Sequence, residues 1–321
     1  MSIERIREIP FYVWMLLGVV ALWISTRLSI AEEFPEEIGG LTLDWPLANW
    51  VDDGVSWLLQ TFGDVFDAIS TFTLQQLLLP TEDFLTAIPW PVFLAAVAIL
   101  AFVSTRSIVP TVVLTALMFM IGTFGFWDLA MITLAIIIIS VFIALLIGLP
   151  IGILAAQSDK LNAFLRPILD GMQTMPSFVY LIPAMMFFGL GKVPAVMATV
   201  IYAVPPLIRL TTLGIRGVSQ SAIEAAEAYG ATRGQILRDV ELPLALPAIM
   251  AGVNQTTMMA LAMVVIASLV GAAGLGEEVL LAINRIEAGR GFEAGLSIVA
   301  LAVIIDRITQ GFAKRYEESI S

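Results

Sequence analysis

The residues whose types and spacing suit a specific task lie in one polar stretch, from Arg216 to Glu241. Ser221 precedes Glu224 by three residues, which is the spacing of a capping box. In that motif the serine oxygen accepts a hydrogen bond from a free backbone N–H, and the carboxylate accepts one from the N–H of the cap. A short helix is therefore predicted to begin at Ser221. Ala225 and Ala226 follow Glu224 on this helix, so its surface has little side-chain bulk and another protein can approach it closely.

A second helix is predicted after a turn in the same stretch. Gly230 can adopt the left-handed conformation that ends a helix, and Thr232 with Gln235 repeats the capping-box spacing. This helix is predicted to run through about Asp239, which makes the stretch a helix-turn-helix. Two interpretations fit the spacing. The small residues form a docking surface for a partner, or they only pack the stretch against its own protein while Glu224 does nothing beyond capping.

Residues suited to catalysis are scarce in this chain. It has no histidine and no cysteine, so the usual nucleophile and base pairs, thiolate metal sites and disulfides are missing. We expect neither a catalytic residue nor a metal site. The sequence also lacks a Gly-x-x-x-x-Gly-Lys-Ser/Thr phosphate loop, and its lysines are Lys160, Lys192 and Lys314. We therefore expect the chain to bind no cofactor, and ATP and Mg to be used by a separate ATPase chain.

The elements that position the polar stretch are predicted to be membrane-spanning helices. Hydrophobic residues make up 59% of the 321 residues and charged residues 13%, a charged share of about half that of soluble domains. The run from Leu129 to Ala156 has no charged residue and exceeds the roughly 20 residues that cross a bilayer core. We predict an all-α polytopic membrane protein with about eight spans, seven of them in the core. The runs are Phe11 to Ile30, Pro89 to Val103, Ile108 to Trp127, Asp128 to Ala156, Pro176 to Leu190, Val193 to Leu213, Leu244 to Val270 and Ala294 to Phe312.

Basic residues divide unequally between the two sides of these spans. With the N-terminus inside, 12 of the 16 Lys and Arg residues fall on or near the cytoplasmic side, which is the bias that the positive-inside rule requires. The four outside are Arg27, Lys192, Arg285 and Arg290. The polar stretch and the C-terminus are then predicted to be cytoplasmic.

Four regions are predicted along the chain. Residues 1–31 hold an N-terminal transmembrane helix, interpreted as uncleaved because no small-x-small cleavage site precedes the next segment. Residues 32–88 carry many acids and no Lys or Arg, so they are predicted to be non-cytoplasmic. Their apolar stripe predicts an amphipathic helix, lying on the outer membrane face or packed against its own bundle. Residues 89–315 form the transmembrane core with the loop 216–243, and residues 316–321 a short cytoplasmic tail.

The polar stretch resembles the EAA loop of ATP-binding-cassette import permeases. The match runs through Glu224-Ala225-Ala226, three residues, Gly230, nine residues, Val240, one residue and Leu242-Pro243, with valine in place of the usual isoleucine. In that family the loop is a coupling helix that inserts into a cleft on the ATPase. The resemblance implies the same role for these residues here.

The flanking sequence is similar to the ProW-like permeases of glycine betaine and proline betaine uptake systems. The resemblance covers most of residues 46–312 and implies a type I importer-like transmembrane domain. The implied cargo is glycine betaine or a related methylated amine, such as choline, proline betaine or trimethylamine N-oxide, carried across the inner membrane. The implied partners are a second permease copy, two ATPase subunits and a periplasmic or lipid-anchored binding protein, with no nucleic acid. The matching stretches are Ile168 to Thr174, Pro176 to Pro183, Pro205 to Ile215, Leu242 to Thr256 and Met263 to Gly271.

Polar and weakly polar residues within the predicted spans are the first candidates for a translocation path. An unsatisfied polar group in hydrocarbon is costly, so such groups tend to face protein or a water-filled cavity. The alternative is that the polar groups form hydrogen bonds between helices, and that the methionine packs against lipid or the core. The candidates are Gln173, Met175, Tyr180, Asn254, Gln255 and Thr256.

Two other function classes compete with an ATP-driven permease. A secondary transporter normally needs titratable groups near the bilayer midplane. The charged residues Asp170, Arg209, Asp306 and Arg307 are all predicted near span ends, which argues against that class. A membrane scaffold that recruits an ATPase without transport is equally compatible with the loop taken alone.

Overall fold

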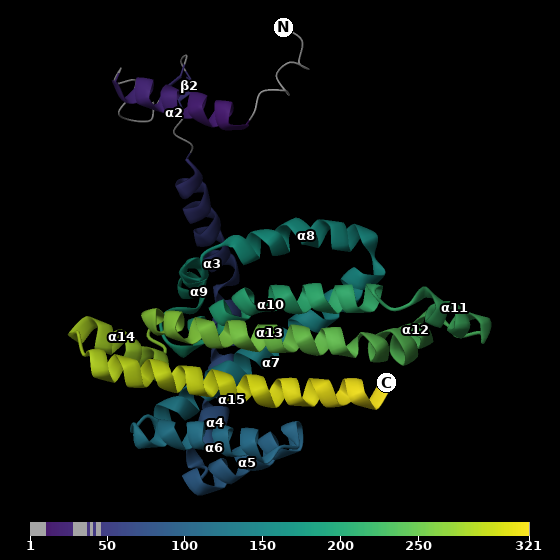
Figure 1. Ribbon diagram of the computed structural model, residues 1–321. Helices are drawn as coiled ribbons and strands as arrows, with labels where there is room; N and C mark the ends of the chain where they lie inside the picture. Colours follow the sequence, from purple (N-terminus) through teal and green to yellow (C-terminus); the bar gives the residue numbers. More distant parts are fainter. Residues whose placement is uncertain (1–10, 28–36, 39–40, 43–45, 321) are drawn as a thin grey trace. The chain divides into compact units, whose positions relative to one another are not determined.

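The computed structural model describes residues 11–27, 37–38, 41–42 and 46–320 (Figure 1). It divides into two compact units, residues 1–58 and 59–321. The first unit contains α2 (Phe11–Arg27), a two-residue antiparallel pair of β1 (Glu37–Ile38) and β2 (Leu41–Thr42), and the beginning of α3 (Leu47–Phe72). Residues 28–30 of the predicted first span and residues 32–36, 39–40 and 43–45 of the predicted acidic segment lie outside the described residues.

The second unit consists of helices throughout its described length. Short π- and 3-10-helices join some of them, which keeps the chain helical across several junctions. The elements are the rest of α3, η1 (Thr73–Leu78), α4 (Leu79–Ala87), α5 (Trp90–Thr105), α6 (Ile108–Thr123), α7 (Trp127–Gln157), α8 (Asp159–Thr174), η2 (Ser177–Tyr180), α9 (Leu181–Phe188), α10 (Lys192–Arg216), α11 (Gln220–Ala228), α12 (Arg233–Ile236), η3 (Leu237–Glu241), α13 (Leu242–Ala267), η4 (Ser268–Val270), α14 (Leu275–Arg285) and α15 (Ala288–Ile320).

Every predicted apolar run coincides with a helix where the structure describes it, which confirms the all-α polytopic fold. Within the described part of the chain, four helices are long and apolar enough to cross a membrane, or five if one bent pair counts as a span; α6 and Ser177–Phe188 are apolar but shorter. The bent pair is Leu47–Ala87 with α5, at 101°. The four long helices are Trp127–Gln157, Lys192–Arg216, Arg233–Val270 and Ala288–Arg315.

The helix α8 was not among the predicted elements. Its apolar residues lie on one face, so no continuous apolar run marks it. Ser158 caps it, because the Ser158 hydroxyl accepts a hydrogen bond from the Leu161 N–H at 3.3 Å. The α8 helix runs alongside the bundle next to α10 (Figure 1).

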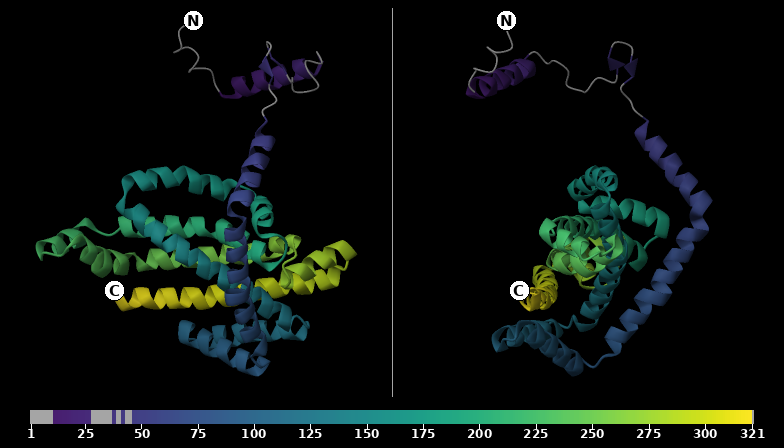
Figure 2. Two further views of the ribbon diagram at one scale, coloured as in Figure 1. Left: turned by 180° about the vertical axis from the view of Figure 1, so that it is seen from behind. Right: turned by 90° about the vertical axis from the view of Figure 1, so that its right-hand side faces the viewer.

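Three helices, α7, α10 and α13, form the centre of the second unit and lie side by side (Figures 1 and 2). Gly148 and Gly152 allow α7 to approach α10 closely. A Cβ atom added at Gly148 would lie 2.7 Å from Leu207 Cδ2, and one at Gly152 would lie 2.7 Å from Thr211 Cβ. Thr212 also donates a hydrogen bond to the Gly152 carbonyl at 3.0 Å. Small residues and hydroxyl groups of this kind are the usual means of joining helices where lipid removes the hydrophobic driving force.

The helical stretch from residue 59 to residue 87 belongs to the second unit and packs against α7, α9 and α10. The Phe66 ring stacks on Phe187 with centroids 4.7 Å apart. Glu82 of α4 forms an ion pair with Lys192 at 2.6 Å, and both side chains are largely shielded from solvent. The predicted boundary at residue 88 falls at the sharp bend between α4 and α5.

The two ends of the second unit differ in the elements that they hold (Figure 1). One end holds α11, α12, the C-terminal part of α15 and the turn between α5 and α6. The opposite end holds α14 and the beginnings of α10 and α15. Lys192, Arg285 and Arg290, which were assigned to the outer side, therefore belong to one end.

Candidate functional site

The predicted helix-turn-helix projects from one end of the second unit (Figure 1). The N-cap of its first helix, α11, lies two residues earlier than the predicted cap at Ser221. Ser219 is the N-cap, with the extended backbone (φ −61°, ψ 132°) that this position requires, and no side chain caps the helix. The predicted capping box of Ser221 and Glu224 is therefore wrong, because Ser221 already lies inside the first turn. The Glu224 carboxylate has no capping task and is exposed.

The structure confirms the predicted left-handed turn at Gly230 after α11. Gly230 has a φ of +80°, and beyond it the Ala231 N–H donates to the Ala226 carbonyl at 3.0 Å. This left-handed turn closes α11. The second capping box is also confirmed, since the Gln235 side-chain oxygen accepts from the Thr232 N–H at 2.9 Å.

The second helix of the loop does not stop near Asp239 as predicted. It passes from α12 through the π-helix η3 directly into α13. Pro243 has no N–H to donate to the carbonyl four residues earlier, and the Leu242 N–H donates to the Leu237 carbonyl five residues earlier instead. Val240, Leu242 and Pro243 are half-buried at this junction, so they form the base of the loop.

The base of the loop is fixed to the bundle by apolar packing and by one arginine. Ile236 is only 3% exposed, and it borders a cavity of about 580 Å³ between the loop and the ends of α7 and α10. Arg216, the last residue of α10, pairs with Asp159 at 2.8 Å and donates to the Ala155 carbonyl at 3.0 Å. These contacts hold the ends of α7, α8 and α10 together beneath the loop.

The tip of the loop is open to a partner. Glu224 and Ala225 are exposed and Ala226 is half-buried. Tyr229 is 94% exposed at the end of α11, although an aromatic ring of this size normally buries much of its surface. Sequence reasoning missed Tyr229, and the available signal was a single aromatic residue in an otherwise small and polar stretch.

The six path candidates do not form one site. Asn254 donates to Asp306 of α15 at 3.0 Å, and Gln255 beside it is exposed. Both residues border an open groove of about 490 Å³ between α13 and α15. Thr256 is fully buried and donates to the Ala203 carbonyl of α10 at 3.0 Å. Thr256 therefore forms a hydrogen bond between helices, which was the alternative to a place on the translocation path.

The remaining path candidates lie around the end of α8. Gln173 and Met175 are exposed there, and neither borders the groove lined by Asn254 and Gln255. Tyr180 is buried, and its hydroxyl donates to the Met172 carbonyl. Its ring lies 5.9 Å from that of Tyr202 in α10.

Two of the charged residues that were predicted near span ends have polar partners. Asp306 lies inside α15, where it accepts hydrogen bonds from Asn254 and from Gln310 at 2.7 Å. Arg209 lies within α10 and is paired with Asp170 at 2.5 Å.

Membrane components of several known transport systems are similar in sequence to this chain. A family model described as "Binding-protein-dependent transport system inner membrane component" matches residues 148–318. The chain is 43% identical to the glycine betaine/proline betaine transport system permease protein ProW of Escherichia coli (strain K12), over 84% of this chain and 75% of that one. It is 46% identical to the glycine betaine transport system permease protein OpuAB of Bacillus subtilis (strain 168), over 83% of this chain and 93% of that one.

A solved structure supports the fold independently. The inward-facing MetNI methionine ABC transporter contains a chain that is 25% identical and superposes with a TM-score of 0.51, covering 59% of this chain and 93% of that one. The similarity therefore includes nearly the whole of that chain.

Proposed function

Because this chain belongs to the family of binding-protein-dependent transport system inner membrane components, we propose that it is the permease subunit of an ATP-driven importer for glycine betaine or a related methylated amine. The observation that carries the substrate class is the similarity to two glycine betaine permeases over more than four-fifths of the chain. Choline, proline betaine and trimethylamine N-oxide carry similar head groups and are the other candidate cargoes.

The proposed energy source is a separate ATPase that binds the loop 216–243. In support of this, the tip presents the exposed residues Glu224 and Ala225, while the base is anchored by Ile236 and Arg216. A rigid base with an exposed tip can transmit a force from a partner to α10 and α13. ATP and Mg act in the ATPase, and we propose that this chain binds neither.

The proposed complex contains two copies of this chain, two ATPase subunits and a periplasmic or lipid-anchored binding protein in the inner membrane. The loop and the C-terminus are assigned to the cytoplasm. They lie at a common end of the second unit (Figure 1), which supports their assignment to the same side of the membrane. An uptake experiment distinguishes this proposal from a secondary transporter and from a scaffold that binds an ATPase without transport.

Uptake into proteoliposomes tests the proposal. Vesicles would contain this chain, its ATPase and the binding protein, with labelled glycine betaine, choline or trimethylamine N-oxide outside and ATP inside. Accumulation of one of these compounds only when ATP is present is the expected result. Accumulation that follows an ion gradient without ATP would establish the secondary transporter. An assembled complex that hydrolyses ATP and accumulates none of the three would contradict the methylated-amine assignment.

The docking role of the loop has its own test. Glu224→Ala should leave the chain folded and inserted in the membrane, because the Glu224 side chain is exposed and makes no capping hydrogen bond. It should uncouple ATP hydrolysis from uptake, because it removes a side chain of the proposed docking surface. Asp239→Ala removes an exposed carboxylate from the base of the same loop and serves as the matched control. Normal coupling in Glu224→Ala would remove this residue from the docking surface.

A further inference from the structure

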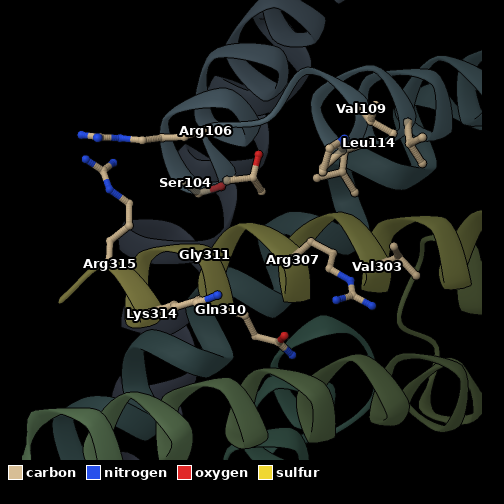
Figure 3. Close-up of a pocket in the computed structure, with 13 residues that line it drawn as sticks. Ser104, Arg106, Val109, Leu114, Val303, Arg307, Gln310, Gly311, Lys314 and Arg315 are labelled. Atoms are coloured by element: carbon tan, nitrogen blue, oxygen red, sulfur yellow. The ribbon is translucent and has the colours of Figure 1, made fainter. Parts of the chain in front are cut away.

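A cavity of about 520 Å³ lies between the turn that joins α5 to α6 and the last turns of α15 (Figure 3). Four basic side chains line it: Arg106 from the turn, and Arg307, Lys314 and Arg315 from α15. None of the loop residues discussed above borders this cavity. It is therefore a second feature at the end of the unit that also holds α11 and α12.

The cavity is a product of close helix packing. A Cβ atom added at Gly311 would lie 2.8 Å from Ser104 Cβ and 2.9 Å from the Ser104 carbonyl oxygen, so only glycine allows α15 to approach α5 this closely. Arg315 crosses the contact and donates to the Val103 carbonyl. Arg106 adopts a left-handed backbone (φ +49°) as it ends α5, a conformation that is uncommon for a residue other than glycine. Two helices and a constrained turn thus hold the cations in place.

None of the four cations in this cavity takes part in an ion pair among the side chains that the structure describes. Asp306, an acid of the same helix as three of them, is hydrogen-bonded to Asn254 and Gln310. Figure 3 shows Arg106 and Arg315 reaching from opposite walls toward the same side of the cavity. Like charges held together repel one another, so an anion bound between them would lower the free energy of the site.

The other wall of the cavity is apolar and continues onto an exposed helix surface. Val109 and Val113 of α6 line it, and Val109 is 72% exposed. The apolar side chains of α6 extend away from the cavity along a helix without a charged residue. An occupant that fits both walls has an anionic head and an apolar tail.

We propose that this cavity binds the head group of an anionic phospholipid, with the phosphate between Arg106 and Arg315, further positive charge from Arg307 and Lys314 along the same cavity, and an acyl chain along Val109 and Val113. Guanidinium groups bind phosphate oxygens in pairs, and basic pockets between membrane helices are suited to anionic head groups. An acidic segment of a partner protein would satisfy the cations but would leave the apolar wall uncovered. The inference does not depend on which solute is transported.

Lipid binding to the purified full-length chain tests this inference. The chain in neutral detergent would be titrated with phosphatidylglycerol or with phosphatidylcholine, and bound lipid would be counted by native mass spectrometry. The triple variant Arg106→Gln/Arg307→Gln/Lys314→Gln should bind phosphatidylglycerol roughly 100-fold more weakly, since each cation near an anionic lipid contributes about fivefold. Arg307→Gln alone should cost about fivefold, which provides a measurement if the triple variant does not fold.

The matched control removes three exposed cations elsewhere, as Lys160→Gln/Arg166→Gln/Arg233→Gln, and should retain the affinity of the unmodified chain. Equal losses in both triple variants, or no loss in the first, would overturn the proposal. Inorganic phosphate in excess should leave phosphatidylglycerol bound. If phosphate displaces it, the cavity binds an anion without regard to lipid. If the first triple variant keeps its lipid but loses affinity for the ATPase, the occupant is an acidic protein segment.

Discussion

The central helices α7, α10 and α13 differ from the loop α11–η3 in whether their small residues are covered by neighbouring atoms. Both are rich in glycine and alanine. In the central helices the small residues are covered, and Gly152 lies against Thr211 and the Ile208 carbonyl with no room for a Cβ atom. In the loop the small residues are uncovered, and a Cβ atom at Gly230 or Gly234 would meet nothing within 4 Å.

This difference separates two roles that sequence composition does not distinguish. A small residue in the central helices is required by the neighbour that it already touches. Ala225 in the loop is exposed, so no neighbour within the chain requires its small side chain. A docking partner is the remaining reason for a small residue at this position. Substitutions should therefore divide into those that damage the fold and those that damage only docking.

The largest effect is expected at Gly152. Gly152→Leu should destabilise the chain by about 3 kcal/mol, because the added side chain meets Thr211 and the backbone of α10. Thermal unfolding in detergent would measure the change. Gly171→Leu is the control, since a Cβ atom at Gly171 meets nothing within 4 Å. Similar losses in both variants would show that the close approach of α7 and α10 does not set the stability.

Gly230 is expected to show the next largest effect, for a conformational reason. Gly230→Val places a β-branched residue at a φ of +80°, which costs about 2 kcal/mol of local strain. The turn should open, and ATP-dependent uptake should fall while the thermal midpoint of the bundle changes little. Gly234→Val introduces the same side chain at a helical position in the loop and should preserve uptake. A large drop in midpoint for Gly230→Val would mean that the loop and the central helices unfold together.

Tyr229 tests the docking surface without disturbing the fold. Tyr229→Ala should change the stability of the isolated chain by less than about 0.5 kcal/mol, because the ring is exposed. It should weaken ATPase binding by about 2 kcal/mol if the ring is a central anchor of the interface. Titration of the chain with its ATPase measures this loss, and Tyr229→Phe should restore most of it. Unchanged affinity in Tyr229→Ala would place the interface elsewhere on the loop.

The smallest effect is expected for the pair of Arg216 and Asp159. A double-mutant cycle with Arg216→Gln and Asp159→Asn should give a coupling of about 0.5 kcal/mol, because Asp159 is largely exposed to water. The single change Arg216→Gln should cost more than this coupling, because it also removes the hydrogen bond to the Ala155 carbonyl. A coupling energy well above 1 kcal/mol would show that the ion pair, rather than packing around Ile236, fixes the base of the loop.

The sequence was sufficient for features that depend on local chemistry. Apolar runs located the helices because lipid requires apolar surface over a fixed length, and Gly230 and Thr232 set a turn through their own backbone preferences. The helix α8 was missed because its apolar residues are not contiguous. The start of α11 was misplaced because Ser219 and Ser221 both suit a cap, and the backbone at residue 219 decides between them.

Contacts between helices could not be predicted in the same way. The hydrogen bond from Asn254 to Asp306 depends on the rotation of α13 and α15 about their own axes, which hydropathy does not specify. The same holds for the cations around Gly311, which come together only because α15 packs against α5. Both sites are made by tertiary packing of residues about 50 or more positions apart in the chain.

The continuity of α12, η3 and α13 has a mechanical consequence. Arg233–Val270 is a single helical stretch of 38 residues, or roughly 57 Å at 1.5 Å per residue. A rod of this length is a lever arm: a tilt of roughly 10° about one end moves the other end by about 10 Å. A displacement at the loop thus reaches the opposite end of this stretch through one covalently continuous helix, without a chain of intervening side-chain contacts.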